Sequence, residues 1–231
     1  MGGSPVYLDS VVIPLVKGPK ILDVGCGFGK WGYLCTSNYW QTDSPIKGAR
    51  PEIVGCDGYE PNVDMCRNNG CYREVLQIVV PPLPFESESF DTVLLIELVE
   101  HLPENKALAL IQEAKRVARD RVILSTPNYL DLREETSTIT GRNPLDAHLS
   151  YIDRGQLRDL GFQLYGSGWT PGSRYLRGAL RRVGMQDWYD NQLRHTLSSL
   201  SYGLPMVADN VIGLWTRGSP EPLAQPAQER N

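Results

Sequence analysis

A short apolar run followed by three closely spaced glycines constrains this chain more than any other feature. The stretch reads ILDVGCGFGKWG over residues 21–32 and places Gly25, Gly27 and Gly29 within five positions. Glycine weakens a strand and costs about 1 kcal/mol relative to alanine in a helix interior. A strand that enters a glycine-rich turn before a helix presents bare backbone N–H groups to a ligand. The stretch therefore predicts a strand, a turn that closely approaches a ligand, and a helix; a tight turn without a ligand is the alternative.

Strand-like apolar segments alternate with helix-like segments through the first two thirds of the chain. Because these segments are continuously apolar, they are typical of strands buried on both faces of a parallel sheet. Residues 103–118 carry apolar side chains three and four positions apart, and Pro103 suits the first position of a helix. The alternation predicts a doubly wound, Rossmann-like α/β sheet. The five expected strands are KILDVG (20–25), EIVGCD (52–57), VLQIVV (75–80), TVLLIE (92–97) and RVILST (121–126).

The last third of the chain predicts two further strands, which complete a seven-stranded sheet. Residues 153–169 are typical of a helix, a turn at Gly161 and a strand, and residues 210–217 are typical of the final strand. Between these two strands we expect a helical insert over residues 170–208, which is unusually long for a connection and suits a substrate lid or an interface.

We expect residues 1–217 to form a single domain and residues 218–231, rich in Pro, Gln and Glu, to form a disordered tail. The insert carries His195 and a group of arginines that suits an anionic substrate, a phospholipid surface or a second copy of the chain in a homodimer. A solvated helix face is the alternative. These arginines are Arg174, Arg177, Arg181, Arg182 and Arg194.

Composition limits the cellular compartments and the kinds of partner that we expect for this chain. The net charge of −4 disfavours a protein that depends on bulk attraction to nucleic acid. Five cysteines without a C-x-x-C pair favour reduced thiols, and no apolar run approaches the roughly 20 residues that cross a bilayer. The N-terminus lacks a charged lead with an apolar stretch behind it, so we expect a cytoplasmic protein. The three histidines are far apart and show no metal-ligand spacing, so we expect no metal.

The spacing of the glycines discriminates between ligands. A dinucleotide fold uses G-x-G-x-x-G, whereas one residue separates Gly27 from Gly29, and the Gly-Lys-Ser/Thr ending of a P-loop is absent. An NAD-dependent oxidoreductase is therefore disfavoured. LDVGCGFG instead resembles motif I of the class I S-adenosylmethionine-dependent methyltransferases. Further segments are similar to the type 11 branch of that family: VGCDGYEPN (54–62), LPFESESFDTVLLIELVEHLPE (83–104), VILSTPN (122–128) and NPLDAHLS (143–150).

The resemblance implies S-adenosylmethionine as cofactor, S-adenosylhomocysteine as product, and a role for each matching position. Asp23 supports the loop near the methionine amino group, Asp57 accepts hydrogen bonds from the ribose hydroxyls, and Glu97 and Leu98 face the methionine end. A carboxylate just past the second strand independently suits a diol, although Asp57 could instead cap the following helix. The other implied contacts are Gly25, Gly27 and Gly29, which leave room for the methionine and ribose, and Gly58 or Tyr59 beside the adenine.

One position departs from the family pattern. Members often carry Asp four residues before the leucine of LPF, where it binds the adenine amine, but this chain has Val79. We therefore expect backbone groups, at Val80 for example, and apolar packing to hold the adenine.

The transfer chemistry points to a few polar residues. The sulfonium cofactor already carries an activated methyl group, so the protein must chiefly align it with the acceptor. His148 is the expected general base, with a loop histidine bonded to the backbone as the alternative. His101 is expected to orient the helix start or close the pocket, and Asn128 and Tyr129 to line the acceptor site unless they serve only the turn.

These features predict a methyltransferase that acts on an oxygen of a small molecule. The choice of oxygen depends on the candidate base. A DNA partner is not expected, because the Asn/Asp-Pro-Pro-Tyr/Phe motif of DNA amino-methyltransferases is replaced by LIELVEHL at the end of the fourth strand. The alternatives are a non-catalytic or regulatory protein that binds S-adenosylmethionine and a methyltransferase that acts on RNA or protein.

Overall fold

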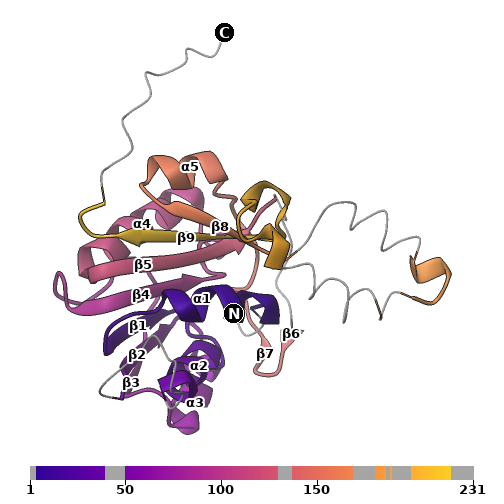
Figure 1. Cartoon of the computed structure of the whole chain (residues 1–231). Coiled ribbons are helices and arrows are strands. Elements are labelled where there is room, and N and C mark those ends of the chain that lie inside the picture. The colour runs from indigo at the N-terminus through magenta and orange to yellow at the C-terminus, as the bar shows by residue number, and fades with distance from the viewer. Residues whose placement is uncertain are drawn as a thin grey trace.

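A seven-stranded sheet forms the centre of the molecule (Figure 1). The computed structural model describes residues 4–39, 50–129, 137–168, 180–185, 188 and 199–219. The strand order is β3-β2-β1-β4-β5-β9-β8, and β9 runs antiparallel to both of its neighbours while the other described pairs in this sheet are parallel. The strands are β1 (Lys20–Val24), β2 (Glu52–Asp57), β3 (Glu74–Gln77), β4 (Phe90–Ile96), β5 (Ala118–Pro127), β8 (Gln163–Ser167) and β9 (Asn210–Thr216).

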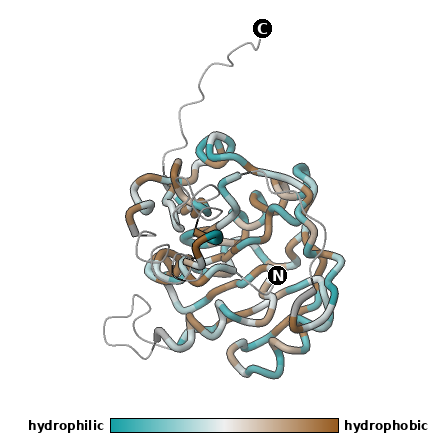
Figure 2. Tube along the Cα trace, turned by 90° about the vertical axis from the view of Figure 1, so that its right-hand side faces the viewer, coloured by the Kyte–Doolittle hydropathy of each residue, from teal (hydrophilic) through white to brown (hydrophobic). Residues whose placement is uncertain are grey.

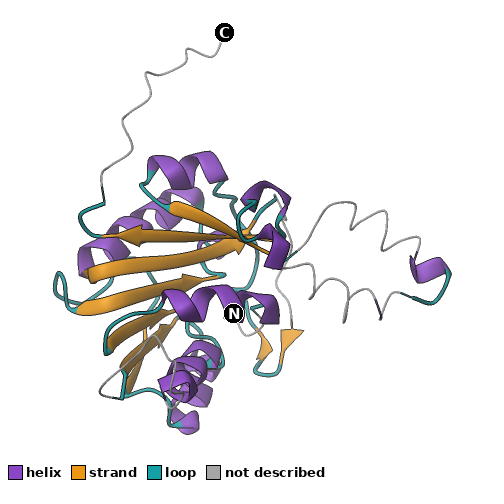
Figure 3. Cartoon of the chain, viewed as in Figure 1, coloured by secondary structure: helices purple, strands orange, loops and turns teal. Residues whose placement is uncertain are grey.

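Helices cover both faces of this sheet (Figure 3). On β1, Ile21 packs with the side chains of α1 and α2, whereas Leu22 and Val24 pack with those of α4 and α5. Successive strand residues point to opposite faces, so a strand covered on both sides is largely apolar. Figure 2 colours the Cα trace by hydropathy and shows hydrophobic stretches (brown) alternating with hydrophilic ones (teal). The helices are α1 (Asp9–Leu15), α2 (Lys30–Tyr39), α3 (Glu60–Asn69), α4 (Glu104–Val117) and α5 (Arg154–Asp159).

Smaller elements complete the described chain. A separate two-stranded hairpin consists of β6 (Ser137–Thr138) and β7 (Gly141–Arg142). Four 3₁₀ helices are described: η1 (Val6–Leu8), η2 (Val99–His101), η4 (Ser199–Ser201) and η5 (Pro205–Val207). In the part of the chain that the structure describes, no helix combines the length and the apolar character needed to cross a membrane.

All seven expected strands are present, and most of their bounds shift by one to three residues from the expected ones. The third strand stops at Gln77 rather than at residue 80, because Gln77 pairs with Asp57, the last residue of its neighbour β2. Pro103 is the N-cap of α4 rather than its first residue, and Ala118 already belongs to β5. The pattern of apolar residues in the sequence therefore predicted which strands form, but predicted their first and last residues less accurately.

The connection between β8 and β9 spans residues 168–209, compared with the helical insert expected over residues 170–208. The described part of it contains η4 and η5. Most of the predicted helical insert, His195 included, and residues 220–231 of the predicted tail lie outside the described residues. A homodimer through the insert stays a prediction.

A buried carboxylate lies inside the sheet layer. Asp23 of β1 is 1% exposed, and the hydroxyl of Tyr72 donates a hydrogen bond to its Oδ2 at 2.6 Å. The Tyr72 hydroxyl also accepts from the backbone N–H of Gly32 in α2 at 3.1 Å, so it links α2 to β1. Burial raises the pKa of Asp23 to about 7; the Tyr72 hydrogen bond opposes this rise and the charge of Asp57 adds to it. The fold therefore tolerates Asp23 best when its carboxyl is protonated.

Replacing Asp23 should remove a pH dependence of stability. Between pH 4 and 7 the folded carboxyl holds a proton that the unfolded chain has released, so the free energy of unfolding falls as the pH rises, by up to about 1.4 kcal/mol per pH unit. Asp23→Asn cannot titrate and should lose this slope in urea unfolding series across that range. Asp64→Asn removes an exposed carboxylate of α3 and should keep it. Parallel pH profiles for wild type and Asp23→Asn would refute the raised pKa.

Candidate functional site

Two cavities adjoin at the glycine turn that follows β1. The larger is a space of about 510 Å³ that is partly open to solvent, and it has Gly25, Asp57, Gly58, Val80, Leu98 and His101 among its lining residues. The smaller, also partly open, is a space of about 290 Å³ and has Gly25, Lys30 and Glu97 among its lining residues. Gly25 lines both, at the edge where the parallel strands end, which is where ligands bind in such sheets. An elongated ligand could therefore lie across Gly25 with one end in each cavity.

Asp57 holds the glycine turn against the end of β2. Its Oδ2 accepts a hydrogen bond from the backbone N–H of Gly27 at 3.0 Å, and its Oδ1 accepts one from the N–H of Tyr59 at 2.9 Å. The N-cap of α3 is Tyr59 and not Asp57, so the helix-cap interpretation does not describe this residue. A carboxylate offers about four acceptor positions, which leaves about two for hydroxyl groups of a ligand.

The three glycines of the turn serve different purposes. All have left-handed backbone angles, with φ of 70° at Gly25, 54° at Gly27 and 87° at Gly29. Gly25 lines both cavities, and Gly27 gives its N–H to Asp57. A Cβ on Gly29 would lie 2.1 Å from Nδ2 of Asn69, so this glycine lets the turn pack against α3. The expected reason for Gly29, room for the ligand, differs from the contact that the structure gives it.

The wall beyond Asp57 is apolar, as expected for a chain with Val79 in place of an aspartate. Val79, Val80 and Leu98 line the larger cavity together with Gly58. Tyr59 does not line it, because its hydroxyl lies against the carbonyl oxygens of Thr140 and Arg142, at 3.2 and 3.1 Å. Sequence reasoning missed Asn143 and Leu145, which also line this cavity from the segment after β7.

Glu97 reaches the smaller cavity from the end of β4, with a left-handed φ of 52° that is uncommon outside glycine. Its carboxylate accepts hydrogen bonds from Oγ of Ser125 at 2.7 Å and from Nδ2 of Asn210 at 2.9 Å. The hydroxyl of Tyr7 in turn donates to Oδ1 of Asn210 at 2.9 Å. Residues of β5, β9 and η1 therefore orient one carboxylate, and no local motif marks Asn210 or Tyr7.

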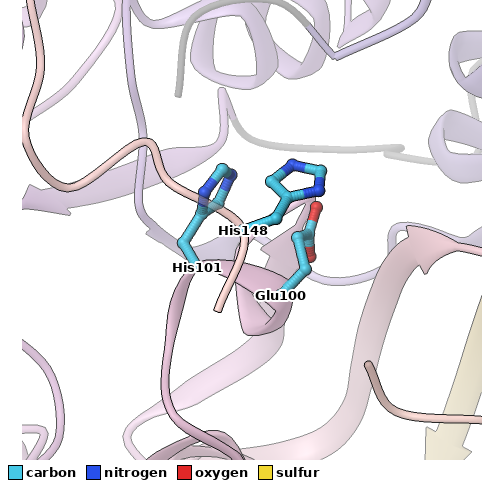
Figure 4. Close-up of side chains that lie close together, drawn as sticks. All are labelled: Glu100, His101 and His148. Atoms are coloured by element: carbon cyan, nitrogen blue, oxygen red, sulfur yellow. The ribbon is translucent and has the colours of Figure 1, made fainter. Parts of the chain in front are cut away.

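Glu100, His101 and His148 lie together beside the larger cavity (Figure 4). They are 2%, 8% and 4% exposed, and the two imidazole rings meet edge to face at 4.8 Å between centroids. Burial is the main cause that holds the pKa of His101 well below its ordinary value, and the neighbouring His148 lowers it further. The 3.9 Å approach of its Nε2 to Asp146 is therefore not an ion pair at neutral pH. Sequence reasoning singled out both histidines but missed Glu100 and the contact between the rings.

Asn128 and Tyr129 do not line either cavity. Nδ2 of Asn128 donates to the carbonyl oxygens of Pro205 and Ala208, at 2.7 and 2.9 Å, and its Oδ1 accepts from Arg154. This side chain ties the end of β5 to η5, which agrees with the turn interpretation. Asp23 is likewise buried behind the turn rather than in a cavity wall.

The family model and the relatives that match this chain are all methyltransferases. Residues 21–121 match a family model described as a methyltransferase domain. The chain is 31% identical over 134 residues to the tRNA (carboxymethyluridine(34)-5-O)-methyltransferase of Arabidopsis thaliana, an alignment that covers 58% of this chain and 30% of that protein. It is 29% identical over 93 residues to the ubiquinone biosynthesis O-methyltransferase of Sinorhizobium medicae, covering 38% of this chain and 33% of that protein.

A crystal structure of a SAM dependent methyltransferase from Archaeoglobus fulgidus has the same fold, with a TM-score of 0.55, 18% sequence identity and 90% of each chain covered. The chain spans about a third of the length of the two curated relatives. The family match begins in β1 and contains the glycine turn, Asp57 and Glu97. The match identifies residues 21–121 as a methyltransferase domain, and the chain as a whole has the fold of an S-adenosylmethionine-dependent methyltransferase.

Proposed function

We propose that the chain binds S-adenosylmethionine across the two cavities and transfers its methyl group to an oxygen atom of a small-molecule acceptor. The observation that carries this proposal is the Asp57 carboxylate in the wall of the larger cavity, next to the glycine that both cavities share. When bound, the cofactor supplies a methyl group activated by its sulfonium. The protein then has to hold the acceptor in line and remove a proton from it.

The residues of the larger cavity fit a nucleoside. Asp57 would accept hydrogen bonds from the ribose hydroxyls, and the side chains of Val79, Val80 and Leu98 would pack on the adenine. Glu97, which Asn210 and Ser125 orient, would accept from the methionine ammonium in the smaller cavity.

The choice of oxygen depends on the buried group around His148. A hydroxyl acceptor must lose a proton, and a positioned base contributes about 10²- to 10⁴-fold to such a step. We place this function at His148, with His101 beside it in the cavity wall. The names of both curated relatives state transfer to oxygen, which supports the same choice.

RNA is the second candidate acceptor, since the name of the Arabidopsis relative states a tRNA substrate. The net charge of −4 favours a small molecule, because binding to nucleic acid gains much of its affinity from cationic side chains. A panel that contains small hydroxyl compounds and bulk tRNA separates the two. Tight cofactor binding with no transfer to any of them would favour the non-catalytic alternative.

Asp57→Asn should weaken cofactor binding without unfolding the protein. A hydrogen bond to a charged group is worth about 1.5–3 kcal/mol, so the dissociation constant for S-adenosylhomocysteine should rise by about 10- to 150-fold in titration calorimetry. Asp64→Asn, an exposed carboxylate on the neighbouring helix, is the matched control and should bind as wild type does. Equal affinity in both variants, or binding of NAD in place of the methionine nucleoside, would refute the site.

His148→Ala should lower kcat by about 10²- to 10⁴-fold, the contribution of a positioned base, and leave cofactor affinity nearly unchanged. The measurement is methyl transfer from labelled cofactor at saturating acceptor, with the dissociation constant of the cofactor determined in parallel. A variant that retains wild-type kcat would place the removal of the proton elsewhere.

A further inference from the structure

The buried group of Glu100, His101 and His148 has the composition of a metal site. One ligand atom from each residue lies within 4.8 Å of the others, and the three side chains come from two segments that are distant in sequence. Figure 4 shows the two imidazole rings and the carboxylate side by side. Two imidazoles and a carboxylate are a donor set that catalytic zinc and other divalent transition ions share.

The backbone holds the two segments together. The carbonyl oxygen of Glu100 accepts hydrogen bonds from the N–H groups of Leu149 at 2.7 Å and Ser150 at 3.2 Å. The hydroxyl of Thr126 donates to Oε2 of Glu100 at 3.3 Å. Such surrounding contacts orient the ligands of metal sites and raise their affinity.

The protonation of His101 suits coordination. Its Nδ1 lies 3.2 Å from the carbonyl oxygen of Ala147, which can only accept, so this contact assigns the proton to Nδ1 and the lone pair to Nε2. Nε2 faces Oδ1 of Asp146 at 3.9 Å, and a cation between a lone pair and a carboxylate would be favourable. A neutral imidazole whose second nitrogen donates to a carbonyl is the form that metal-bound histidine usually takes.

We propose that Glu100, His101 and His148 bind one divalent first-row transition metal ion, such as Zn²⁺, Co²⁺ or Mn²⁺. Mg²⁺ and Ca²⁺ prefer oxygen ligands throughout, so the two nitrogens disfavour them. Zinc bonds of about 2.0–2.2 Å place tetrahedral ligands roughly 3.4 Å apart, so small side-chain rotations bring the group from within 4.8 Å to binding distance.

The catalytic consequence depends on the proposed function. His101 lines the larger cavity, so the open coordination positions of the ion would face the acceptor. A hydroxyl bound to such an ion has a lowered pKa and passes its proton to water near neutral pH. In the metal-loaded protein His148 would be a ligand of the ion, and the ion would promote the loss of the acceptor's proton in place of a general base.

Titration of the metal-stripped full chain with Co²⁺, without cofactor or acceptor, tests the site. Wild type should bind one equivalent and show visible absorption bands of cobalt held by nitrogen and oxygen. Glu100→Gln and His148→Asn keep the side-chain size and should each weaken Co²⁺ binding at least about tenfold. Asp64→Asn removes an exposed carboxylate of α3 that is not part of this group and should bind Co²⁺ as wild type does.

Three outcomes overturn the proposal. The first is uptake of less than one equivalent of Co²⁺ by wild type. The second is an unchanged affinity for Co²⁺ in the ligand variants. The third is a near-ultraviolet thiolate band, which would assign the cobalt to cysteines. Cofactor affinity, measured separately by calorimetry, distinguishes this failure from that of the proposed function. If the protein binds cofactor but not cobalt, only the proposed metal site is refuted. If it binds cobalt but transfers no methyl group, only the proposed function is refuted.

Discussion

The geometry of the site depends on one carboxylate that accepts two backbone hydrogen bonds. Asp57 binds the N–H of Gly27 on one side and that of Tyr59 on the other, so it fixes the turn after β1 to the end of β2. The turn can accept this contact because its glycines adopt left-handed angles that other residues rarely reach. The same contact leaves part of the carboxylate directed at the cavity. A single side chain therefore both fixes the turn and lines the larger cavity.

The antiparallel strand β9 orients a second carboxylate, that of Glu97. It pairs with β5 from Asn210 to Thr216, which places the amide of Asn210 beside Glu97 at the end of β4. Tyr7 then holds the far side of that amide. An uncommon backbone angle at Glu97 persists because contacts from three other elements over-determine its position. The wall of the smaller cavity at Glu97 therefore depends on residues from both ends of the described chain.

Features that follow from local sequence were predictable. Continuous apolar runs predicted the strands, and Asp57 was singled out because it ends one of them and the carboxyl ends of parallel strands share an edge. Contacts between distant segments were not predictable, since no spacing links Asn210 to Glu97 or His148 to Glu100. Gly29 illustrates the limit, because the pattern indicates that a side chain is excluded there but not that α3 excludes it.

The placement of Asn210 also bears on where this protein can be divided. The recognisable family segment ends at residue 121, inside β5, yet the partners of Glu97, the histidine pair and the wall at Leu145 include residues beyond that point. A fragment cut to the recognisable segment would keep the glycine turn and lose the orientation of its second carboxylate. The contacts that shape the two cavities therefore extend well beyond the segment that matches the family model.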